Sequence, residues 1–272
     1  CPAWVKFCEN RYPEFRKNIS TCRSPQEMFG ALLKEEARMN AEKDRAEGKE
    51  PKKTMVVSIM PCTAKKAEIT RPEHYTDGEQ NVDYVLTTTE ITRMIQEAGI
   101  DLAQVQPEAL DMPFGLASGA GAIFGVTGGV TEAVLRRLVN SSRAEDLEEI
   151  SFSGVRGVDG IKEAKVNLNG REVKIAVVNG LHCAEDLLEK MKAGEAHYDF
   201  VEVMACKRGC IAGGGQPVPI GPRTKKARLE GIYKIDNMAQ IKLSNENPII
   251  TEVYAGILKG KEHKLLHNEM NV

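Results

Sequence analysis

Apolar side chains recur at helical spacing near the start of the chain, at Trp4, Phe7, Cys8, Tyr12 and Phe15. This spacing predicts a helix. A second helix is expected to begin at Ser24-Pro25, because serine is a favoured N-cap and proline fits the first helical turn. Its apolar positions run into EEARMNAEKDRAEGKEPKK, a charged stretch that we interpret as a solvated helix end and linker.

Four continuous apolar runs predict β-strands, with helical patterns between them. The first, TMVVSIMPC, has the composition of a strand buried on both faces. The others span residues 82–87, 174–180 and 198–206, and helical patterns cover residues 89–98, 131–140 and 183–191. Asn169-Gly170 is a hairpin signal, which makes part of one sheet antiparallel. This alternation predicts an α/β fold with largely parallel sheets.

The pattern also indicates where a site would form. In parallel sheets, sites lie beyond the carboxyl ends of the strands, and Cys62 and Cys206 both occupy that position. From about Arg223 the pattern changes. Residues 235–241 and 248–258 have helical patterns with no strand between them, so we expect a helical C-terminal tail.

Composition narrows the possible function classes. The chain has 272 residues, 42% apolar and 28% charged, which is ordinary for a globular protein of one large or two modest domains. The formal net charge of −2 gives no reason to expect a nucleic-acid or membrane partner. No apolar run approaches the roughly 18 residues of a membrane span and no signal-peptide pattern is present, so we expect a cytoplasmic protein. The chain opens on a cysteine, as a piece of a longer protein would.

The cysteines point to metal chemistry. Their number, seven, is odd, and they are scattered along a long chain, which argues against a disulfide framework. Cys1 precedes a proline, Cys62 follows one, and Cys206 and Cys210 form a CxxxC pair. Zinc sites usually take their cysteines as CxxC pairs, so widely separated cysteines fit an iron–sulfur cluster better. We interpret the remaining three as buried structural thiols, namely Cys8, Cys22 and Cys183.

Two glycine-rich segments are expected to let backbone approach a bulky object, because no Cβ intervenes. One is the run Gly213, Gly214 and Gly215, which follows the CxxxC pair. The other is SGAGAIFGVTGGV, residues 118–130. No GKS or GKT follows this second segment, which argues against a nucleotide-binding loop.

Taken together, these stretches resemble the catalytic domain of iron-only, or [FeFe], hydrogenases. Cys1-Pro2-Ala3-Trp4 matches the end of the family's TSCCPxW motif. MPCTAKKAE at residues 60–68 matches MPCxxKxxE, and residues 200–217 match FxExMACxxGCxxGGGQP. The tail resembles the family's small subunit. The resemblance implies domains at residues 1–222 and 223–272, and two lobes of largely parallel sheets flanked by helices, with the metal cluster between them.

The resemblance also implies a cofactor and a reaction. The cofactor is the H-cluster, a [4Fe–4S] cubane joined through a cysteine sulfur to a diiron unit with CO, cyanide and azadithiolate ligands. By motif position Cys1, Cys62, Cys206 and Cys210 would bind the cubane, with Cys210 as the bridge. The reaction interconverts H2 with protons and electrons. The expected partners are ferredoxin or an NAD(P)-linked flavoprotein subunit, and the maturation proteins that supply the diiron unit.

Further roles follow from motif position alone. Lys65 would place its ammonium against a cyanide, as a charge-assisted hydrogen bond. Ser20 matches a position in the family's proton path. The expected cofactor-binding residues line the ligands, form apolar walls or belong to the cysteine motifs: Pro25, Gln26, Met60, Pro61, Phe124, Met204 and Gly214.

Several departures leave alternatives open. The family's proton-donating cysteine would immediately precede Cys1, and the glutamates and accessory cluster domains upstream of it are absent from this chain. Ala67 stands where phenylalanine is common, and the tail ends in LLHNEMNV. A Narf-like iron–sulfur assembly factor without a diiron unit is one alternative, and an H2-sensing hydrogenase-like regulator is another. The stretch IFGVTGGVTEAVLRR favours hydrogenase.

Overall fold

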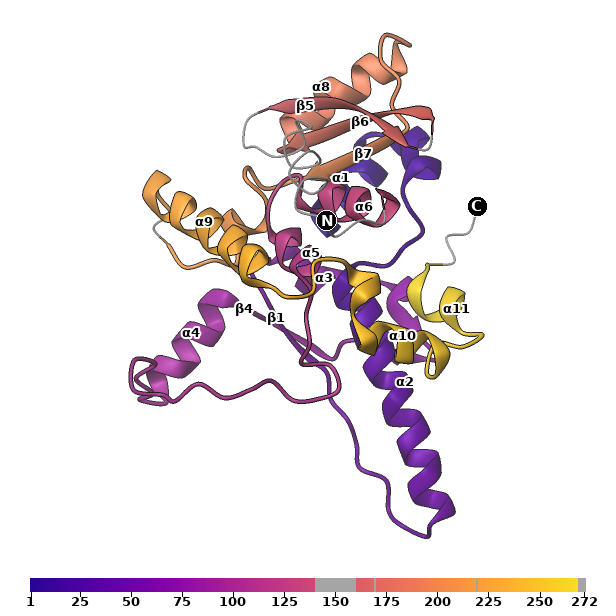
Figure 1. Ribbon diagram of the computed structural model, residues 1–272, viewed down its shortest axis with the longest axis vertical. Coiled ribbons are helices and arrows are strands. Elements are labelled where there is room, and N and C mark those ends of the chain that lie inside the picture. The colour runs from indigo at the N-terminus through magenta and orange to yellow at the C-terminus, as the bar shows by residue number, and fades with distance from the viewer. Residues whose placement is uncertain (140–159, 169, 219, 269–272) are drawn as a thin grey trace.

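The computed structural model describes residues 1–139, 160–168, 170–218 and 220–268. Figure 1 shows that this part of the chain forms two lobes, each built around a small sheet of its own. The predicted α/β class is therefore confirmed. No helix among the described residues is both long and apolar enough to cross a membrane.

The first lobe is built on strands β5 (Ile161–Leu168), β6 (Arg171–Asn179) and β7 (Phe200–Met204). Strands β5 and β6 pair antiparallel, which confirms the predicted hairpin, although Asn169 of its turn lies outside the described residues. Strands β6 and β7 pair parallel.

Three helices cover the two faces of this sheet (Figure 1): α1 (Pro2–Arg11), α6 (Gly129–Val139) and α8 (Leu181–Lys192). Successive side chains of a strand point to opposite faces. On β6, Ile175 and Val177 therefore pack with Leu135 of α6, whereas Ala176 and Val178 pack with the α8 side of the sheet. Helix α1 lies against α8, where the buried Cys8 joins a cluster with Leu188.

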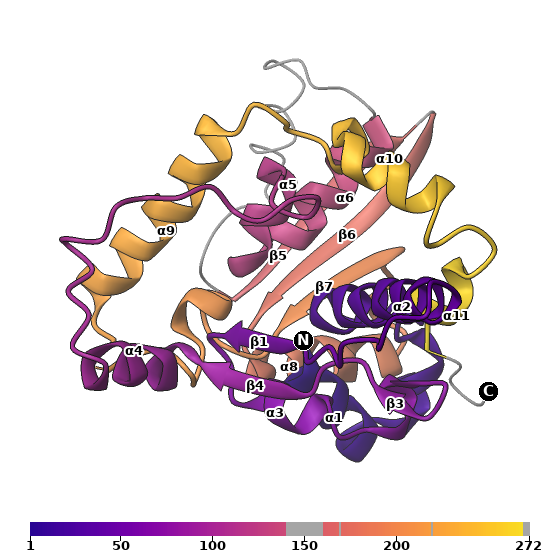
Figure 2. The ribbon, with the colours of Figure 1, turned by 90° about the horizontal axis from the view of Figure 1, so that it is seen from below.

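The second lobe contains strands β1 (Val57–Met60) and β4 (Tyr84–Thr87), which pair parallel. The long helix α2 (Pro25–Ala46) begins at the predicted Ser24 N-cap, whose side chain accepts from the Glu27 N–H. Figure 2 shows α2 lying close to the β1–β4 pair, α3 beside β4, and α4 beyond the carboxyl end of β4. The other elements here are α3 (Ala64–Glu68), α4 (Thr88–Glu97), the antiparallel pair β2 (Tyr75–Thr76) and β3 (Glu79–Gln80), and α5 (Gly119–Ala122) between the lobes.

The prediction that β1 is buried on both faces is wrong. Val57 and Ile59 remain 50% and 55% exposed, and Tyr84 on β4 is 57% exposed. The opposite face of this two-stranded sheet carries Met60 and the buried Val85, which pack with Val56, Ile69 and Val82. A continuous apolar run is consistent with burial on both faces, but here only one face is covered by the described residues.

The C-terminal tail is helical, as predicted, but its first helix begins earlier than expected. Helix α9 spans Pro222–Met238, because Pro222 fits the first helical turn, and it ends before the predicted limit at residue 241. Helices α10 (Pro248–Ala255) and α11 (Glu262–Leu266) follow. They pack on α2 through a core cluster that joins the tail to the second lobe: Ala31, Leu32, Val253, Leu258 and Leu265.

Candidate metal-cluster site

Two cysteine-bearing loops meet between the lobes. Cys62 follows β1 after a single proline, and Cys206 follows β7 by one residue. Cys210 opens a 3₁₀ turn, Cys210–Ala212, that leads into the glycine run. The Gly215 N–H donates to the Pro61 carbonyl at 3.1 Å. The two loops are therefore in direct backbone contact, as the strand-end argument predicts.

The glycine run makes this contact possible. A Cβ at Gly213 would lie 2.0 Å from the Pro61 carbonyl oxygen, and one at Gly215 would lie 2.7 Å from the Cys62 nitrogen. Both positions therefore face the backbone of the other loop rather than a bulky ligand. Gly214 is the exposed member of the run, and a Cβ there would meet only the Thr63 hydroxyl at 3.4 Å. The predicted close approach is thus an approach of loop to loop.

The segment at residues 118–130 uses its glycines in the same way. A Cβ at Gly129 would lie 1.7 Å from the Ile123 carbonyl oxygen, and one at Gly119 would lie 2.2 Å from Asp236 Oδ1. The expectation that these two glycines face a ligand is therefore wrong. They allow the start of α6 and α5 to pack tightly against their neighbours.

The thiols of the CxxxC pair are protonated as free cysteines. Burial raises the pKa of Cys206, and the neighbouring Cys62 raises it further. Burial, and then the neighbouring Cys62, raises the pKa of Cys210. Metal ligands are thiolates, so cluster binding would release these protons. The hydrogen bond from the Gly215 N–H to the Pro61 carbonyl brings the segments of these three cysteines together.

Cys1 lies near the same site. It directly precedes α1, which packs against α3, the helix that follows Cys62. Cys1 itself is exposed. Four thiols from three segments of the chain have the chemistry of a [4Fe–4S] donor set. The described residues contain no group of three or more His, Cys, Asp or Glu side chains that would hold a single metal ion. A [4Fe–4S] cluster does not need such a group, because each of its four cysteines binds a different iron.

Lys65 is not a solvated surface lysine. It lies on α3, its side chain is 12% exposed, and its Nζ is 2.6 Å from Glu68 Oε2. Glu68 also accepts from the Ser24 hydroxyl at 3.0 Å and from Gln26 Nε2 at 3.2 Å. The ammonium is therefore held by a buried carboxylate at the second lobe's side of the site.

The other predicted cofactor-binding residues have unequal exposure. Gln26 is buried and Met204 is 7% exposed, whereas Met60, Pro61 and Phe124 are half-buried. Pro25, at the first turn of α2, and Gly214 are exposed. Ser20 is also exposed, in the segment before α2, and its hydroxyl accepts from the Cys22 N–H at 3.2 Å. The structure therefore places Ser20 at the surface.

Of the three cysteines interpreted as buried structural thiols, only Cys8 fits. Cys183 is half-buried. Cys22 is exposed, because it lies in the short extended segment that bridges to His267 of the tail. The prediction of burial is wrong for Cys22. It rested on the general preference of cysteine for the protein interior, which does not show that this residue lies in an extended segment at the surface.

Glu202 organises the first lobe's side of the site, and no role for it was predicted. It is buried, and its carboxylate accepts from the Gly128 N–H at 2.7 Å and from both the N–H and hydroxyl of Thr131. Burial raises the pKa of Glu202 against these hydrogen bonds. Glu202 thereby fixes the start of α6. Glu202 and Glu68 are both defined positions of the matched motifs FxExMACxxGCxxGGGQP and MPCxxKxxE. Their motif positions could have indicated a role for both residues.

The fold and this site define the class of protein. The family model described as iron only hydrogenase large subunit, C-terminal domain, matches residues 1–214, and the iron hydrogenase small subunit model matches residues 222–269. The chain belongs to the iron-only hydrogenase family.

Individual relatives include hydrogenases and an assembly factor. The chain is 40% identical to iron hydrogenase 1 of Clostridium pasteurianum, over 98% of this chain and 47% of that protein. It is 42% identical to the NADP-reducing hydrogenase subunit HndD of Solidesulfovibrio fructosivorans, over 98% of this chain and 45% of that protein. It is 30% identical to the cytosolic Fe-S cluster assembly factor narfl of Danio rerio, over 99% and 66%. The chain thus spans about half the length of these two hydrogenases.

Solved structures agree with the sequence relatives. A variant of [FeFe]-hydrogenase HydA1 from Chlamydomonas reinhardtii matches with a TM-score of 0.77 and 36% sequence identity. The match covers 98% of this chain and 74% of that one. The two-lobed arrangement is therefore that of [FeFe] hydrogenases.

Proposed function

We propose that this chain is the catalytic, H-cluster-bearing part of an [FeFe] hydrogenase that interconverts H2 with protons and electrons. The observation that carries the proposal is the contact between the loops of Cys62 and of Cys206 and Cys210, with Lys65 held beside them. Cys1 completes a donor set of four thiols. These four would hold the cubane, and Cys210 would bridge to the diiron unit. When bound, this group supplies the redox chemistry of H2, and the protein supplies binding, orientation and electrostatics.

Lys65 is proposed to hold a positive charge where water is largely excluded. An ammonium has three N–H donors, and one of them is directed at Glu68. The others remain for an anionic ligand such as cyanide, and such a charge-assisted hydrogen bond is strong in a dry site. Gln26 has its amide engaged by Glu27, Glu68 and Ser58. We therefore assign Gln26 to holding Glu68 in place while its side chain lines the site.

The apolar walls and the proton path remain proposals from motif position. Met204 is buried, and Met60 and Phe124 are half-buried, which suits side chains that keep water from the cluster. Ser20 is proposed as the surface end of a proton path, and its exposure supports that place.

Residues 1–222 are proposed as the cluster domain and residues 223–272 as the small-subunit-like segment. The electron partner is proposed to be ferredoxin or an NAD(P)-linked flavoprotein subunit, and the diiron unit to come from maturation proteins. The similarity to the NADP-reducing hydrogenase subunit HndD supports an NAD(P)-linked partner. The proposed compartment is the cytoplasm, where the free cysteines would stay reduced.

A Narf-like assembly factor is the second candidate, because narfl matches over nearly the whole chain and over a larger share of its own length than the hydrogenases do. An H2-sensing regulator with little turnover is the third. The three candidate functions differ in whether the protein carries a diiron unit and in whether it turns over H2.

Infrared spectroscopy of the parent protein, matured in a host with the maturation enzymes, separates these candidates. A hydrogenase is expected to show CO and cyanide bands together with H2 evolution. A spectrum without these bands in a preparation that holds an iron–sulfur cluster would assign the chain to the assembly factors. Bands with negligible turnover would assign it to the sensors.

A further inference from the structure

A carboxyl and an imidazole lie together in the interior of the second lobe. Glu27, in the first turn of α2, is 0% exposed, and His74, at the end of the 3₁₀ turn Pro72–His74, is 5% exposed. His74 Nδ1 is 4.0 Å from Glu27 Oε2. This Nδ1 is buried and has no hydrogen-bond partner in the part of the chain that the structure describes. Buried polar atoms are rarely left without partners, so this one requires an explanation.

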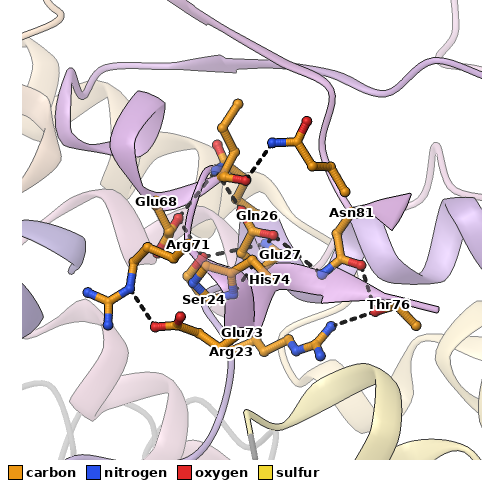
Figure 3. Close-up of polar contacts among 12 residues, drawn as sticks. Arg23, Ser24, Gln26, Glu27, Glu68, Arg71, Glu73, His74, Thr76 and Asn81 are labelled. Atoms are coloured by element: carbon orange, nitrogen blue, oxygen red, sulfur yellow. Dashed lines mark hydrogen bonds and ion pairs between the residues drawn. The ribbon is translucent and has the colours of Figure 1, made fainter. Parts of the chain in front are cut away.

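The other contacts of Glu27 come from neutral amides. Its Oε1 accepts from Gln26 Nε2 at 3.2 Å, and its Oε2 accepts from Asn81 Nδ2 at 3.5 Å (Figure 3). Among the described residues, no lysine or arginine forms an ion pair with Glu27. A buried carboxylate without a paired cation is costly, whereas a protonated carboxyl has an O–H that needs an acceptor. The unpaired nitrogen of a neutral His74 is such an acceptor, within reach of a small rotation.

The charges around the pair favour this neutral form. Burial raises the pKa of Glu27 to about 7, with Glu68 adding to the rise and Lys65 opposing it. Burial lowers the pKa of His74, with Arg23 and Arg71 adding to the fall and Glu68 and Glu73 opposing it. Both directions describe a carboxylic acid beside a neutral imidazole. They also make the pair able to change charge near neutral pH.

The pair is connected to the proposed cluster site. Gln26 Nε2 donates both to Glu27 Oε1 and to Glu68 Oε2, each at 3.2 Å, and Glu68 holds Lys65 at 2.6 Å. Ionisation of Glu27 would draw this N–H toward Glu27 and place a second negative charge near Glu68. The change would reach Lys65 through one amide and one carboxylate.

The pair also lies beside solvent. A surface pocket of about 650 Å³ is lined by residues on either side of His74, including Arg71, Glu73 and Thr76. The Thr76 hydroxyl donates to Asn81 Oδ1 at 2.7 Å, and Asn81 contacts Glu27. The pair is therefore separated from this pocket by the side chains of Thr76 and Asn81.

We propose that Glu27 and His74 share one exchangeable proton and act as positioning residues that set the charge and placement of Lys65 through Gln26 and Glu68. The first half of the proposal concerns the folded chain alone, and the second half rests on the proposed function. The exchange is a proton transfer only: Glu27 releases its proton to solvent or to His74, and no electrons move.

Infrared spectroscopy of the matured parent protein between about pH 5 and about pH 9 tests both halves. The carbonyl band of a protonated buried carboxyl should disappear with a midpoint near 7, the value at which Glu27 titrates. Glu27→Gln should lack this band. His74→Phe removes the acceptor of the O–H, so the midpoint should fall by roughly one pH unit. The matched control is Glu42→Gln, an exposed position on the same helix, which should leave the band and its midpoint unchanged.

The cyanide bands of the same samples report on Lys65. In the unaltered protein they should shift with the midpoint of the carboxyl band, and in Glu27→Gln they should be independent of pH. No titrating carboxyl band, or a midpoint that is unchanged or raised in His74→Phe, would overturn the shared proton. Cyanide bands that are present but insensitive to pH would overturn the link to Lys65 and leave the proposed function standing. A spectrum without cyanide bands would instead contradict the proposed function, and the carboxyl titration would still decide the pair.

Discussion

At the residue scale, Lys65 illustrates what a motif can and cannot say. The motif places a lysine three residues after a cysteine, which predicts a cation near the cluster. It does not say that Glu68 lies 2.6 Å from the ammonium, or that Ser24 and Gln26 hold that carboxylate. The contacts of Ser24 and Gln26 with Glu68 join the start of α2 to α3, about forty residues away in sequence, so they depend on the fold. Glu27 and His74 escaped prediction for the same reason.

The first prediction concerns this lysine. Lys65→Asn keeps a hydrogen-bond donor but loses the charge, and Glu68 is left without its cation. H2 evolution by the matured parent protein should fall about 10–100-fold, and the cyanide bands should shift. The adjacent Lys66, which is 42% exposed and pairs with Glu90, provides the control. Lys66→Asn should leave both readouts unchanged. Equal effects of the two variants would show that Lys65 has no special place at the cluster.

At the element scale, the loops and helix starts depend on close backbone contacts. Sequence patterns predicted the strands before Cys62 and Cys206 and the helices α4, α6 and α8 with small errors at their ends. They did not predict that Gly213 and Gly215 pack against the other cysteine loop, or that Gly129 packs against residue 123. A glycine run signals that a side chain would not fit. It does not identify the neighbour.

Gly213→Ala tests the loop contact. Gly213 has φ of −63° and ψ of 156°, which alanine adopts without strain, so the main change is the steric clash with Pro61, with a lesser one at the Cys210 carbonyl oxygen. The two cysteine loops must then separate, and iron bound per chain should fall severalfold in the matured parent protein. Gly231→Ala in α9 is the control, because an added Cβ there has no atom within 4 Å. Normal iron content in Gly213→Ala would contradict the loop-to-loop account.

A second prediction at this scale concerns the joint between α6 and α9. Arg136 forms buried hydrogen bonds with Asp236 at 2.8 and 2.7 Å and with Glu132 at 2.5 Å. Asp236→Ala would leave the buried guanidinium with one fewer carboxylate and should lower the free energy of unfolding by about 3–5 kcal/mol. The exposed pair Lys226–Glu230 on the same helix is the comparison. Glu230→Ala should change stability by about 0.5 kcal/mol or less, measured by denaturant unfolding.

At the scale of the whole molecule, sequence reasoning identified the α/β class, the two cysteine loops and the helical tail. It failed for β1, whose Val57 and Ile59 are half exposed. An apolar run shows that both faces of a strand carry apolar side chains. It does not show whether another element covers each face. It also failed to show how the tail docks, because the cluster of Ala31, Leu32 and Leu265 forms across more than two hundred residues.

The pH dependence of global stability follows from the buried pair. The pKa of Glu27 is raised from 4.5 to about 7, so the folded state binds more protons than the unfolded state in that window. Stability should therefore fall as pH rises from about 4.5 to about 7, by about 3 kcal/mol in total, and then level off. The lowered pKa of His74 has the opposite consequence, because stability is lost as pH falls below its ordinary value of 6.5.

Denaturant unfolding at about pH 5 and about pH 7.5 measures this effect. Glutamine does not ionise, so Glu27→Gln should not lose stability as this carboxyl ionises with rising pH. The stability of Glu27→Gln relative to the unaltered chain should therefore rise with pH across this interval. Glu42→Gln should follow the unaltered chain at both values. A stability difference between Glu27→Gln and the unaltered chain that does not change with pH would contradict the protonated state of Glu27.

The central claim is that the four thiols hold one H-cluster and that Cys210 bridges its two halves. The most direct measurement compares the infrared spectrum and H2 evolution of Cys206→Ala and Cys210→Ala in the matured parent protein. Cys206→Ala removes one cubane ligand and is expected to retain a damaged cluster with reduced turnover. Cys210→Ala removes the covalent link, so turnover should be abolished and the CO and cyanide bands lost or uncoupled from the cubane. Activity like that of the unaltered protein in Cys210→Ala, or equal partial activity in the two variants, would contradict the account.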